Sequence, residues 1–445
     1  MVQIDPLFAY TISDDCKTIK RYCCILQQTL SIPLHIIIGK GDIVWDGRGR
    51  AVHDHGLDKI CKGAGVLLIR KWITLLLMMT FFLFEAGCAE DADVYEDNTA
   101  ADVFADTTMA ADFHPDGIKD HSASAVVYCA DNGEVLYGHH IHDRKAIASI
   151  TKIMTAIIAL EYAAANDKAV TVTSEMYAEG SSMYLKEGEI IRLSQLVRGM
   201  MAVSGNDAAN AAAIAVAGSA EKFAGLMNEK AYQLGMKNTQ FVTPSGLDSE
   251  GHYSTAYDMA LLCAYAMEND TFADIVSQQT VSVEYISPEG KVQTFRNHNK
   301  LLSICEGCIG IKTGFTKKAG RTLTSCCERD GIRLVVVTLN DGDDWNDHCG
   351  LYDYCFSLVE RRRLCDTSRT VTVPLVGGTN DSVELVPEKE LDITIRKDEA
   401  NQPQEVIEAP HFIYAPAVRG RIYGRIRYLM GEKEIASCRL VTGTQ

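Results

Sequence analysis

One apolar segment, residues 149–165, constrains the fold of this chain more than any other feature. Its large apolar side chains recur at close to helical spacing, and no glycine or proline interrupts them, so the segment predicts a single α-helix. The helix would be apolar over most of its surface. We therefore expect it to lie buried at the centre of a domain.

The segments that follow predict a mixed α/β domain. A second helical stretch over residues 193–217 is interrupted at Ser204-Gly205-Asn206, which places Ser204 on a connection between two helices. Asp330-Gly331 and, upstream, Asn132-Gly133 are typical of tight hairpin turns. Three segments late in this region have the composition of strands: residues 310–314, 322–328 and 333–339.

The remainder of the chain divides into segments of different composition. Residues 90–120 hold many acidic residues and almost no long apolar ones, which is typical of a solvated linker. From residue 368, short alternating runs separated by Gly, Asp and Asn predict a small β domain over residues 368–445. The 445 residues exceed one average domain, and we expect the larger, mixed domain to occupy residues 121–362.

An export signal is predicted near the start of the chain, although not at residue 1. Two basic residues precede a short apolar run over residues 72–84, and small residues follow it. This order predicts a signal peptide or N-terminal anchor over residues 66–89, because the run is shorter than the about 20 apolar residues of a membrane-spanning helix. Residues 1–65 show no sustained periodicity and stay unassigned; translation that begins at Val66 would account for them.

Charge and ligand spacing argue against two classes of protein. The formal net charge of −16 argues against a nucleic-acid partner, because phosphate binding needs a concentrated basic face. Cys305 and Cys308 have the spacing of half a zinc site, but no second pair of ligands stands at a matching distance along the chain. His139, His140 and His142 are more typical of a polar loop than of a zinc peptidase. We expect no metal and no cofactor.

Ser149 and Lys152 are the candidates for a nucleophile and its base. They stand three residues apart at the start of the predicted helix, so their side chains lie on one face, one turn apart. A serine hydroxyl needs a base to take its proton, and a lysine in a partly desolvated apolar pocket can lose its own proton near neutral pH. The positive end of the helix would favour an oxyanion beside them. The spacing alone is weak evidence, since Ser219 and Lys222 repeat it.

Two further motifs offer groups that suit a carboxylate-bearing substrate. Ser204 supplies a second hydroxyl for proton transfer, and the Asn206 amide can hold both a substrate carbonyl and a lysine. On a predicted strand, Lys312 supplies positive charge, Thr313 a hydroxyl and Gly314 close backbone approach. Each motif alone also fits an ordinary connection or strand, so the order of all three carries the functional argument.

The three motifs in this order resemble those of the penicillin-recognising serine enzymes, which are the D,D-peptidases and serine β-lactamases. The resemblance is to D-alanyl-D-alanine carboxypeptidases in particular and extends over roughly residues 122–360. It implies a β-lactamase/transpeptidase-like α/β fold: an antiparallel sheet with helices on both faces, a helical subdomain, and then a small all-β domain. The segments that carry it are residues 148–156, 180–188, 204–208, 243–248 and 311–316.

The resemblance implies an exported hydrolase of peptidoglycan stem peptides, acting at the cell wall or the outer face of the membrane. Ser149 would attack the carbonyl between two terminal D-alanines and form an acyl-enzyme, with Lys152 as base and Ser204 as proton relay. The backbone N–H groups of Ser149 and Phe315 would form the oxyanion hole. β-Lactam antibiotics would acylate the same serine, and only an uncleaved N-terminal segment would attach the protein to a membrane. Substrate would be bound by Asn206, Lys312, Thr313 and Gly314.

Three other activities share these motifs. A serine β-lactamase needs fast deacylation, and the Glu-x-x-Leu-Asn word that activates water in one large class does not occur between Asn206 and Lys312. A D,D-endopeptidase that cuts cross-links stays open. So does a non-catalytic penicillin sensor or wall-binding protein, although every motif residue is present. Release of D-alanine would eliminate the non-catalytic reading.

Overall fold

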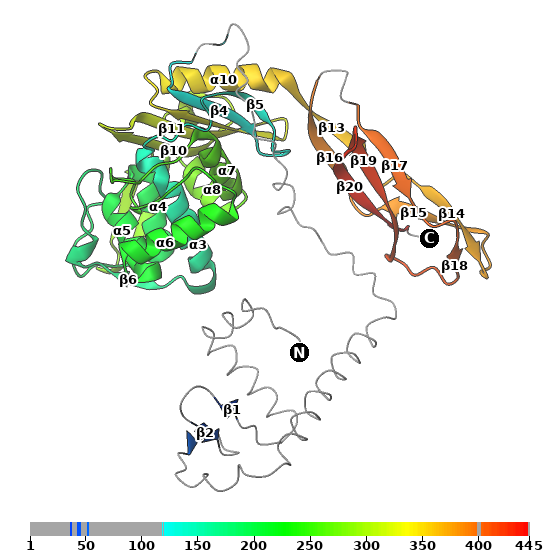
Figure 1. Cartoon of the computed structure of the whole chain (residues 1–445), viewed down its shortest axis with the longest axis horizontal. Coiled ribbons are helices and arrows are strands. Elements are labelled where there is room, and N and C mark those ends of the chain that lie inside the picture. The colour runs from blue at the N-terminus through cyan, green and yellow to red at the C-terminus, as the bar shows by residue number, and fades with distance from the viewer. Residues whose placement is uncertain are drawn as a thin grey trace, which may run out of the picture. The chain divides into compact units, whose positions relative to one another are not determined.

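Two compact units make up the chain, Met1–Asp97 and Asn98–Gln445. The computed structural model describes residues 118, 120–397 and 402–443, together with the backbone of three short strands nearer the N-terminus (Figure 1). The predicted signal segment and nearly all of the predicted acidic linker lie outside the described residues. The three short strands form one antiparallel sheet: β1 (Ile36–Ile37), β2 (Asp42–Trp45) and β3 (Ala51–Val52).

A five-stranded antiparallel sheet is the framework of the larger domain. Two hairpins in this sheet close through tight turns whose residues adopt left-handed dihedrals: φ is 52° at Asp330, 74° at Gly331 and 76° at Gly133. Both predicted hairpins are therefore confirmed. The first strand in the order that follows, β10, occupies one edge of the sheet. The strand order is β10 (Cys308–Thr316), β11 (Gly320–Arg329), β12 (Ile332–Leu339), β4 (Ser124–Cys129) and β5 (Val135–His139).

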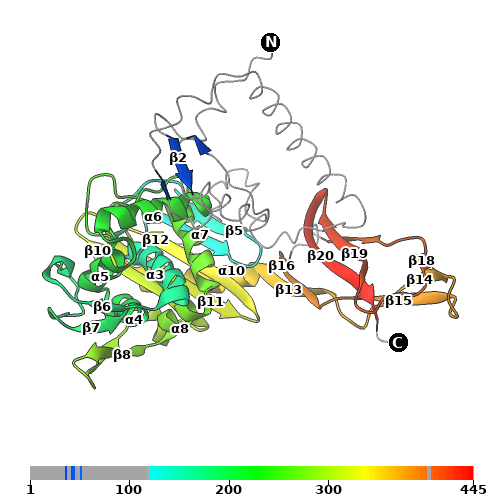
Figure 2. The ribbon, with the colours of Figure 1, turned by 90° about the horizontal axis from the view of Figure 1, so that it is seen from below.

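Helices cover both faces of this sheet, as the family resemblance implies (Figures 1 and 2). Successive strand residues point to opposite faces. Val126 and Val335 pack into the core that contains α3, α7 and α8, whereas Val127 and Val336 pack into the core beneath α10. The helices concerned are α3 (Lys152–Asn166), α7 (Ala256–Met267), α8 (Asp270–Ser277) and α10 (Asp344–Leu358).

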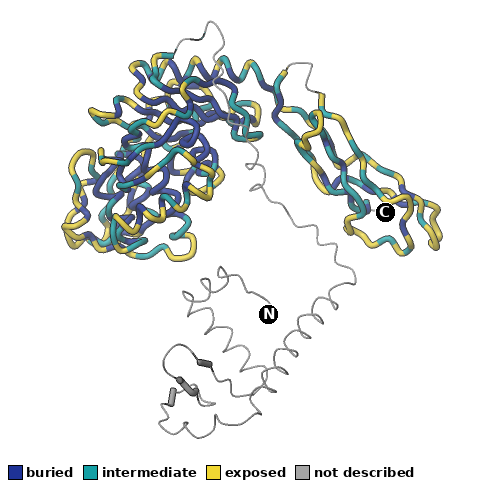
Figure 3. The backbone as a smooth tube through the Cα atoms, in the orientation of Figure 1, coloured by how far each residue is buried: buried dark blue, intermediate teal, exposed yellow. Residues whose placement is uncertain are grey.

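The long apolar segment forms the central helix α3, preceded by the 3₁₀ turn η4 (Ala148–Thr151). The combined helix Ala148–Asn166 is long and apolar enough to cross a membrane, yet 67% of its apolar window is buried inside the domain. Figure 3 shows the dark blue, buried tube in this part of the chain. The prediction of a buried core helix is therefore confirmed, although the helix opens with a 3₁₀ turn.

A helical subdomain and a small second sheet complete this domain. The helical stretch predicted over residues 193–217 forms α4 (Leu193–Val203) and α5 (Asn206–Ala217), interrupted at Ser204 and Gly205 as expected, and both helices pack against α3. Further elements are η5 (Ser174–Met176), α6 (Ala220–Gln233), α9 (Leu301–Ile304) and the four-stranded sheet β6 (Ala169–Thr171), β7 (Ile190–Arg192), β8 (Thr280–Ser287) and β9 (Val292–Arg296).

The C-terminal region is all-β, as predicted. Its core is built by alternate inward residues such as Val373, Leu385, Ile426 and Leu440. Strands β13 (Val359–Cys365) and β16 (Leu391–Arg396) pair with each other. The remaining six form a sheet in the order β17 (Gln404–Glu408), β19 (Ile422–Met430), β20 (Lys433–Thr442), β15 (Ser382–Pro387), β14 (Val371–Val376) and β18 (Ile413–Tyr414).

Candidate active site

Ser149 and Lys152 meet at the turn where the core helix begins. Ser149 lies on η4 and Lys152 is the first residue of α3, and the Lys152 amine Nζ is 3.0 Å from Ser149 Oγ. Ala148, with φ of 48°, brings the chain sharply into this turn. The contact expected from helical spacing is present, and it joins a half-buried hydroxyl to a fully buried amine.

The surroundings of Lys152 favour its neutral form. Burial lowers the pKa of the amine well below its usual value, Lys312 nearby lowers it further, and Asp207 opposes both effects in part. Besides Ser149, Nζ contacts Asn206 Oδ1 at 2.7 Å and the Ser245 carbonyl at 2.6 Å. These two oxygens only accept, so they take the two N–H bonds of a neutral amine. The remaining lone pair is left for the proton of Ser149.

Asn206 is held so that its carbonyl oxygen faces Lys152. Its Nδ2 group donates to the Glu179 carbonyl at 2.6 Å, and its backbone N–H donates to the Ser181 carbonyl at 2.7 Å. Ser204, two residues before Asn206, is buried at the end of α4 and adopts the left-handed conformation, with φ of 60°. The interruption between α4 and α5 therefore delivers the Asn206 amide to the buried lysine.

Asp207 ties the neighbouring segment, residues 182–185, to the start of α5. Its carboxylate accepts from Ser182 Oγ at 2.6 Å, from Met183 N at 2.9 Å and from Leu185 N at 3.1 Å. Tyr184 protrudes from this segment with 77% of its surface exposed and φ of 58°. An exposed aromatic side chain thus stands on a segment that Asp207 holds by three hydrogen bonds.

Strand β10 brings the Lys312-Thr313-Gly314 motif against the nucleophile turn. A Cβ at Gly314 would lie only 2.9 Å from Ser149 N, so no larger residue fits between the strand and the turn. Lys312 is buried, which lowers its pKa to about 7, and its amine donates to the Thr313 carbonyl at 2.9 Å. Phe315 follows on the same strand and is 66% exposed. The third motif therefore reaches Ser149 through backbone proximity.

The turn over residues 243–248 contributes a contact that no motif assigned. Its Ser245 carbonyl accepts from Lys152, and Gly246, with φ of 81°, packs so closely that a Cβ would overlap the Ala148 carbonyl. His252 joins the same two regions: its Nδ1 accepts from Val242 N at 3.0 Å, so its Nε2–H donates to Thr151 Oγ1 at 2.8 Å. Burial lowers the pKa of this histidine to about 4 and keeps it neutral. The family resemblance included residues 243–248 but assigned no role to this carbonyl or to His252.

The second Ser-x-x-Lys word forms a helix cap. Ser219 precedes α6, and its Oγ accepts from the backbone N–H of Lys222 at 3.2 Å while the lysine side chain points to solvent. The same spacing therefore gives two different structures, and only Lys152 is desolvated.

Similarity to known proteins identifies the family. The chain matches the D-alanyl-D-alanine carboxypeptidase family over residues 109–343 and the C-terminal domain of penicillin-binding protein 5 over residues 362–445. It is 32% identical over 315 residues to the D-alanyl-D-alanine carboxypeptidase DacF of Bacillus subtilis, covering 68% of this chain and 80% of that one. DacB2 of Mycobacterium tuberculosis is 35% identical over 260 residues, 56% and 88% of the two chains.

Solved structures agree with the sequence relatives. The crystal structure of DacD from Francisella tularensis aligns with a TM-score of 0.55 at 26% identity, covering 78% of this chain and 98% of that one. Penicillin-binding protein 5 from Haemophilus influenzae gives a TM-score of 0.56 at 26% identity, with coverage of 73% and 97%. The chain belongs to the D-alanyl-D-alanine carboxypeptidase family of serine peptidases.

Proposed function

We propose that Ser149 of this D-alanyl-D-alanine carboxypeptidase is the acylating nucleophile and that Lys152 is its base. The observation that carries the proposal is the environment of Lys152: a fully buried amine, 3.0 Å from Ser149 Oγ, whose other two partners can only accept. Burial favours the neutral form of such an amine, and the neutral form has one lone pair that can accept the Ser149 proton.

In the proposed reaction the substrate is a peptidoglycan stem peptide that ends in D-Ala-D-Ala. Lys152 takes the Ser149 proton while Oγ attacks the carbonyl between the two D-alanines. The proton passes through Ser204 to the leaving amine, and the terminal D-alanine departs. Water then attacks the acyl-enzyme, with the same base, and restores Ser149. A β-lactam would acylate Ser149 in place of the peptide and deacylate slowly.

Substrate orientation falls to the other motif residues. Lys312 and the Thr313 hydroxyl would bind the terminal carboxylate, Asn206 would hold a substrate amide, and Gly314 lets the peptide approach the strand. The backbone N–H groups of Ser149 and Phe315 would stabilise the oxyanion. This assignment is supported by the closeness of Gly314 to Ser149 N.

We further propose that the chain is exported through residues 66–89 and works outside the cytoplasm. Residues 121–362 would be the catalytic domain and residues 368–445 a separate β domain. The polymeric cell wall, which carries the substrate, lies outside the cytoplasmic membrane, so export is a requirement of the activity.

The test is D-alanine release from diacetyl-Lys-D-Ala-D-Ala, measured with labelling by a fluorescent penicillin. Ser149→Ala should abolish both signals, and Ser219→Ala, which alters the second Ser-x-x-Lys word, should change neither. Labelling without release would indicate the D,D-endopeptidase or the penicillin sensor, and rapid loss of label would indicate a serine β-lactamase. Full activity in Ser149→Ala would refute the assignment.

A further inference from the structure

Four cysteine thiols gather in the core beneath α10, beside the edge strand β10. Cys305 follows α9, Cys308 begins β10, Cys327 lies on β11 and Cys349 lies on α10. Cys305 and Cys327 are 22 positions apart in the chain, yet their sulfurs lie 3.9 Å from each other. Neither sulfur takes part in the proposed acylation, so this contact is separate from the active site.

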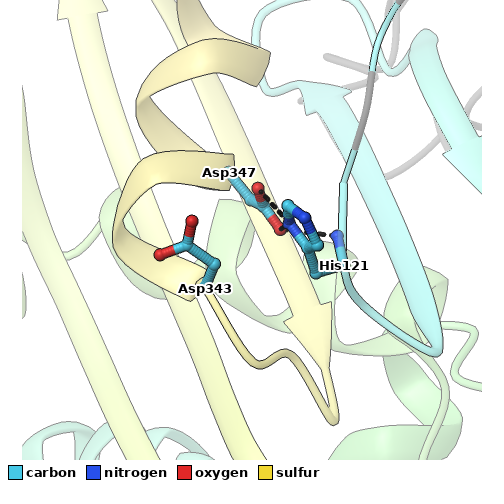
Figure 4. A group of neighbouring side chains, drawn as sticks. All are labelled: His121, Asp343 and Asp347. Carbon is cyan, nitrogen blue, oxygen red and sulfur yellow. Dashed lines mark hydrogen bonds and ion pairs between the residues drawn. The ribbon is translucent and has the colours of Figure 1, made fainter.

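The thiols form a row of contacts and do not surround one point. The contacts run in the order Cys349, Cys305, Cys327 and Cys308. A tetrahedral zinc site needs ligand atoms that are all close to one another. Among the described residues, the one group of three mutually close ligand atoms is made by His121, Asp343 and Asp347 instead (Figure 4). The row therefore favours a bond between two neighbouring sulfurs over a shared metal ion.

Backbone contacts hold the Cys305–Cys327 pair in place. The turn after Cys305 packs directly on β11, because Glu328 N donates to the Gly307 carbonyl at 2.9 Å. Cys308 N donates to the Cys305 carbonyl at 3.2 Å and closes the turn. The sulfurs of a disulfide lie about 2.0 Å apart, so each sulfur must move by about 1 Å. Side-chain rotation can supply that movement while the backbone stays where it is.

Cys305 is the thiol suited to react first. Hydrogen bonds from neighbouring thiols, that of Cys327 above all, and the charge of Arg329 lower the pKa of Cys305 against the effect of burial. The same hydrogen bond raises the pKa of Cys327, which keeps its proton. Cys305 itself is nearly buried, but its neighbours in the turn, Ile304 and Glu306, are exposed. A small oxidant can therefore approach the more acidic of the two thiols.

We propose that Cys305 and Cys327 form a reversible disulfide by exchange with a low-molecular-weight disulfide such as oxidised glutathione. The Cys305 thiolate attacks one sulfur of the oxidant, whose S–S bond breaks, and the first glutathione thiolate leaves and takes a proton from water. Cys327 Sγ then attacks the Cys305 sulfur, and its proton passes to the second departing glutathione thiolate. Two protein thiols are oxidised, and one small disulfide is reduced to two thiols. The bond would fasten the start of β10, the strand that carries Lys312, to β11.

The experiment uses the full chain, first reduced and then incubated in its folded state with oxidised glutathione. Remaining thiols are alkylated before digestion, and mass spectrometry maps the peptides that stay joined. We expect one Cys305–Cys327 link that a phosphine reductant reverses. Tm should rise by about 5–10 °C, because the bond closes a long loop of the unfolded chain. A link from Cys305 to Cys349, or from Cys327 to Cys308, would overturn the assignment.

Two variants supply a matched comparison. Cys305→Ser should lose both the link and the increase in Tm, and its turn, with exposed residues on either side, should tolerate a hydroxyl. Cys349→Ser, which alters the next thiol in the row, should form the link as the parent does. Thermal unfolding of the reduced variants separates loss of the link from loss of the fold. Parent protein that keeps both thiols, stops at a glutathione adduct on Cys305, or retains one Zn²⁺ per chain on these thiols would refute the disulfide.

Discussion

Replacing Gly314 by alanine should disable acylation while leaving the domain folded. The added Cβ would lie 2.9 Å from Ser149 N and 3.1 Å from Ile150 N, and it would overlap Thr322 Oγ1. The first two atoms belong to the backbone of the nucleophile turn, so no side-chain rotation relieves them. Either β10 or η4 must move.

The size of that movement sets the expected loss. Ordinary contacts of a Cβ begin near 3.4 Å, so the turn and the strand must separate by about 0.5 Å or more to accept the methyl group. A misplacement of about 1 Å costs about 100-fold in rate, and loss of one oxyanion donor costs a similar factor. We therefore expect kcat/KM to fall about 100-fold. Overpacking of this kind costs about 1–3 kcal/mol of stability, which a domain of this size can absorb.

The assay is D-alanine release and penicillin labelling of Gly314→Ala, compared with Gly350→Ala. Gly350 lies on α10, where an added Cβ meets no atom within 4 Å, so its replacement should be silent. Thermal unfolding of both variants separates loss of positioning from loss of structure. A Gly314→Ala protein with activity within about threefold of the parent would refute the claim that β10 must touch the nucleophile turn.

Two further predictions concern protonation. Asn206→Asp places a carboxylate against the Lys152 amine and should raise the pKa of that amine, so penicillin acylation at neutral pH should fall and should recover at alkaline pH; an unshifted pH–rate profile would contradict the base assignment. The pKa of His252 is about 4 when folded, against 6.5 as a reference. The unfolded chain therefore binds more protons, and about 2 kcal/mol of unfolding free energy should be lost between pH 7 and pH 5. Urea titrations should show a smaller loss in His252→Gln, and an equal loss would contradict this.

Side-chain contacts within the motifs were accessible from sequence because regular structure fixes their spacing. A three-residue interval at a helix start places Ser149 over Lys152 in any helix, and an interrupted helical pattern located Ser204. The same reasoning could not separate Ser149 from Ser219, since both intervals are identical. Desolvation distinguishes them, and it comes from β10, α5 and the 243–248 turn, which are remote in the chain.

Backbone contributions and long-range pairs were not accessible in the same way. The Ser245 carbonyl that holds Lys152 belongs to the main chain, so residue type carries no signal for it. The sheet β6–β9 pairs Ile191 with Tyr285, almost a hundred positions apart, through strands as short as three residues. Likewise the Cys327 sulfur lies beside the Cys305 sulfur because β11 folds back. The position of Cys327 in the chain has no zinc-like spacing, so the sequence did not predict this contact.

The charge of buried Lys312 affects the pKa of buried Lys152, and the two lysines have different proposed roles. Burial lowers the pKa of both amines, but Lys312 is brought only to about 7, and its charge helps to lower that of Lys152. A carboxylate bound beside Lys312 would favour its protonated form, and that charge in turn disfavours a proton on Lys152. Asn206 Oδ1 and the Ser245 carbonyl accept the N–H bonds of the neutral amine without adding negative charge. This arrangement favours the positive charge on Lys312 and the neutral form on Lys152, the lysine that contacts Ser149.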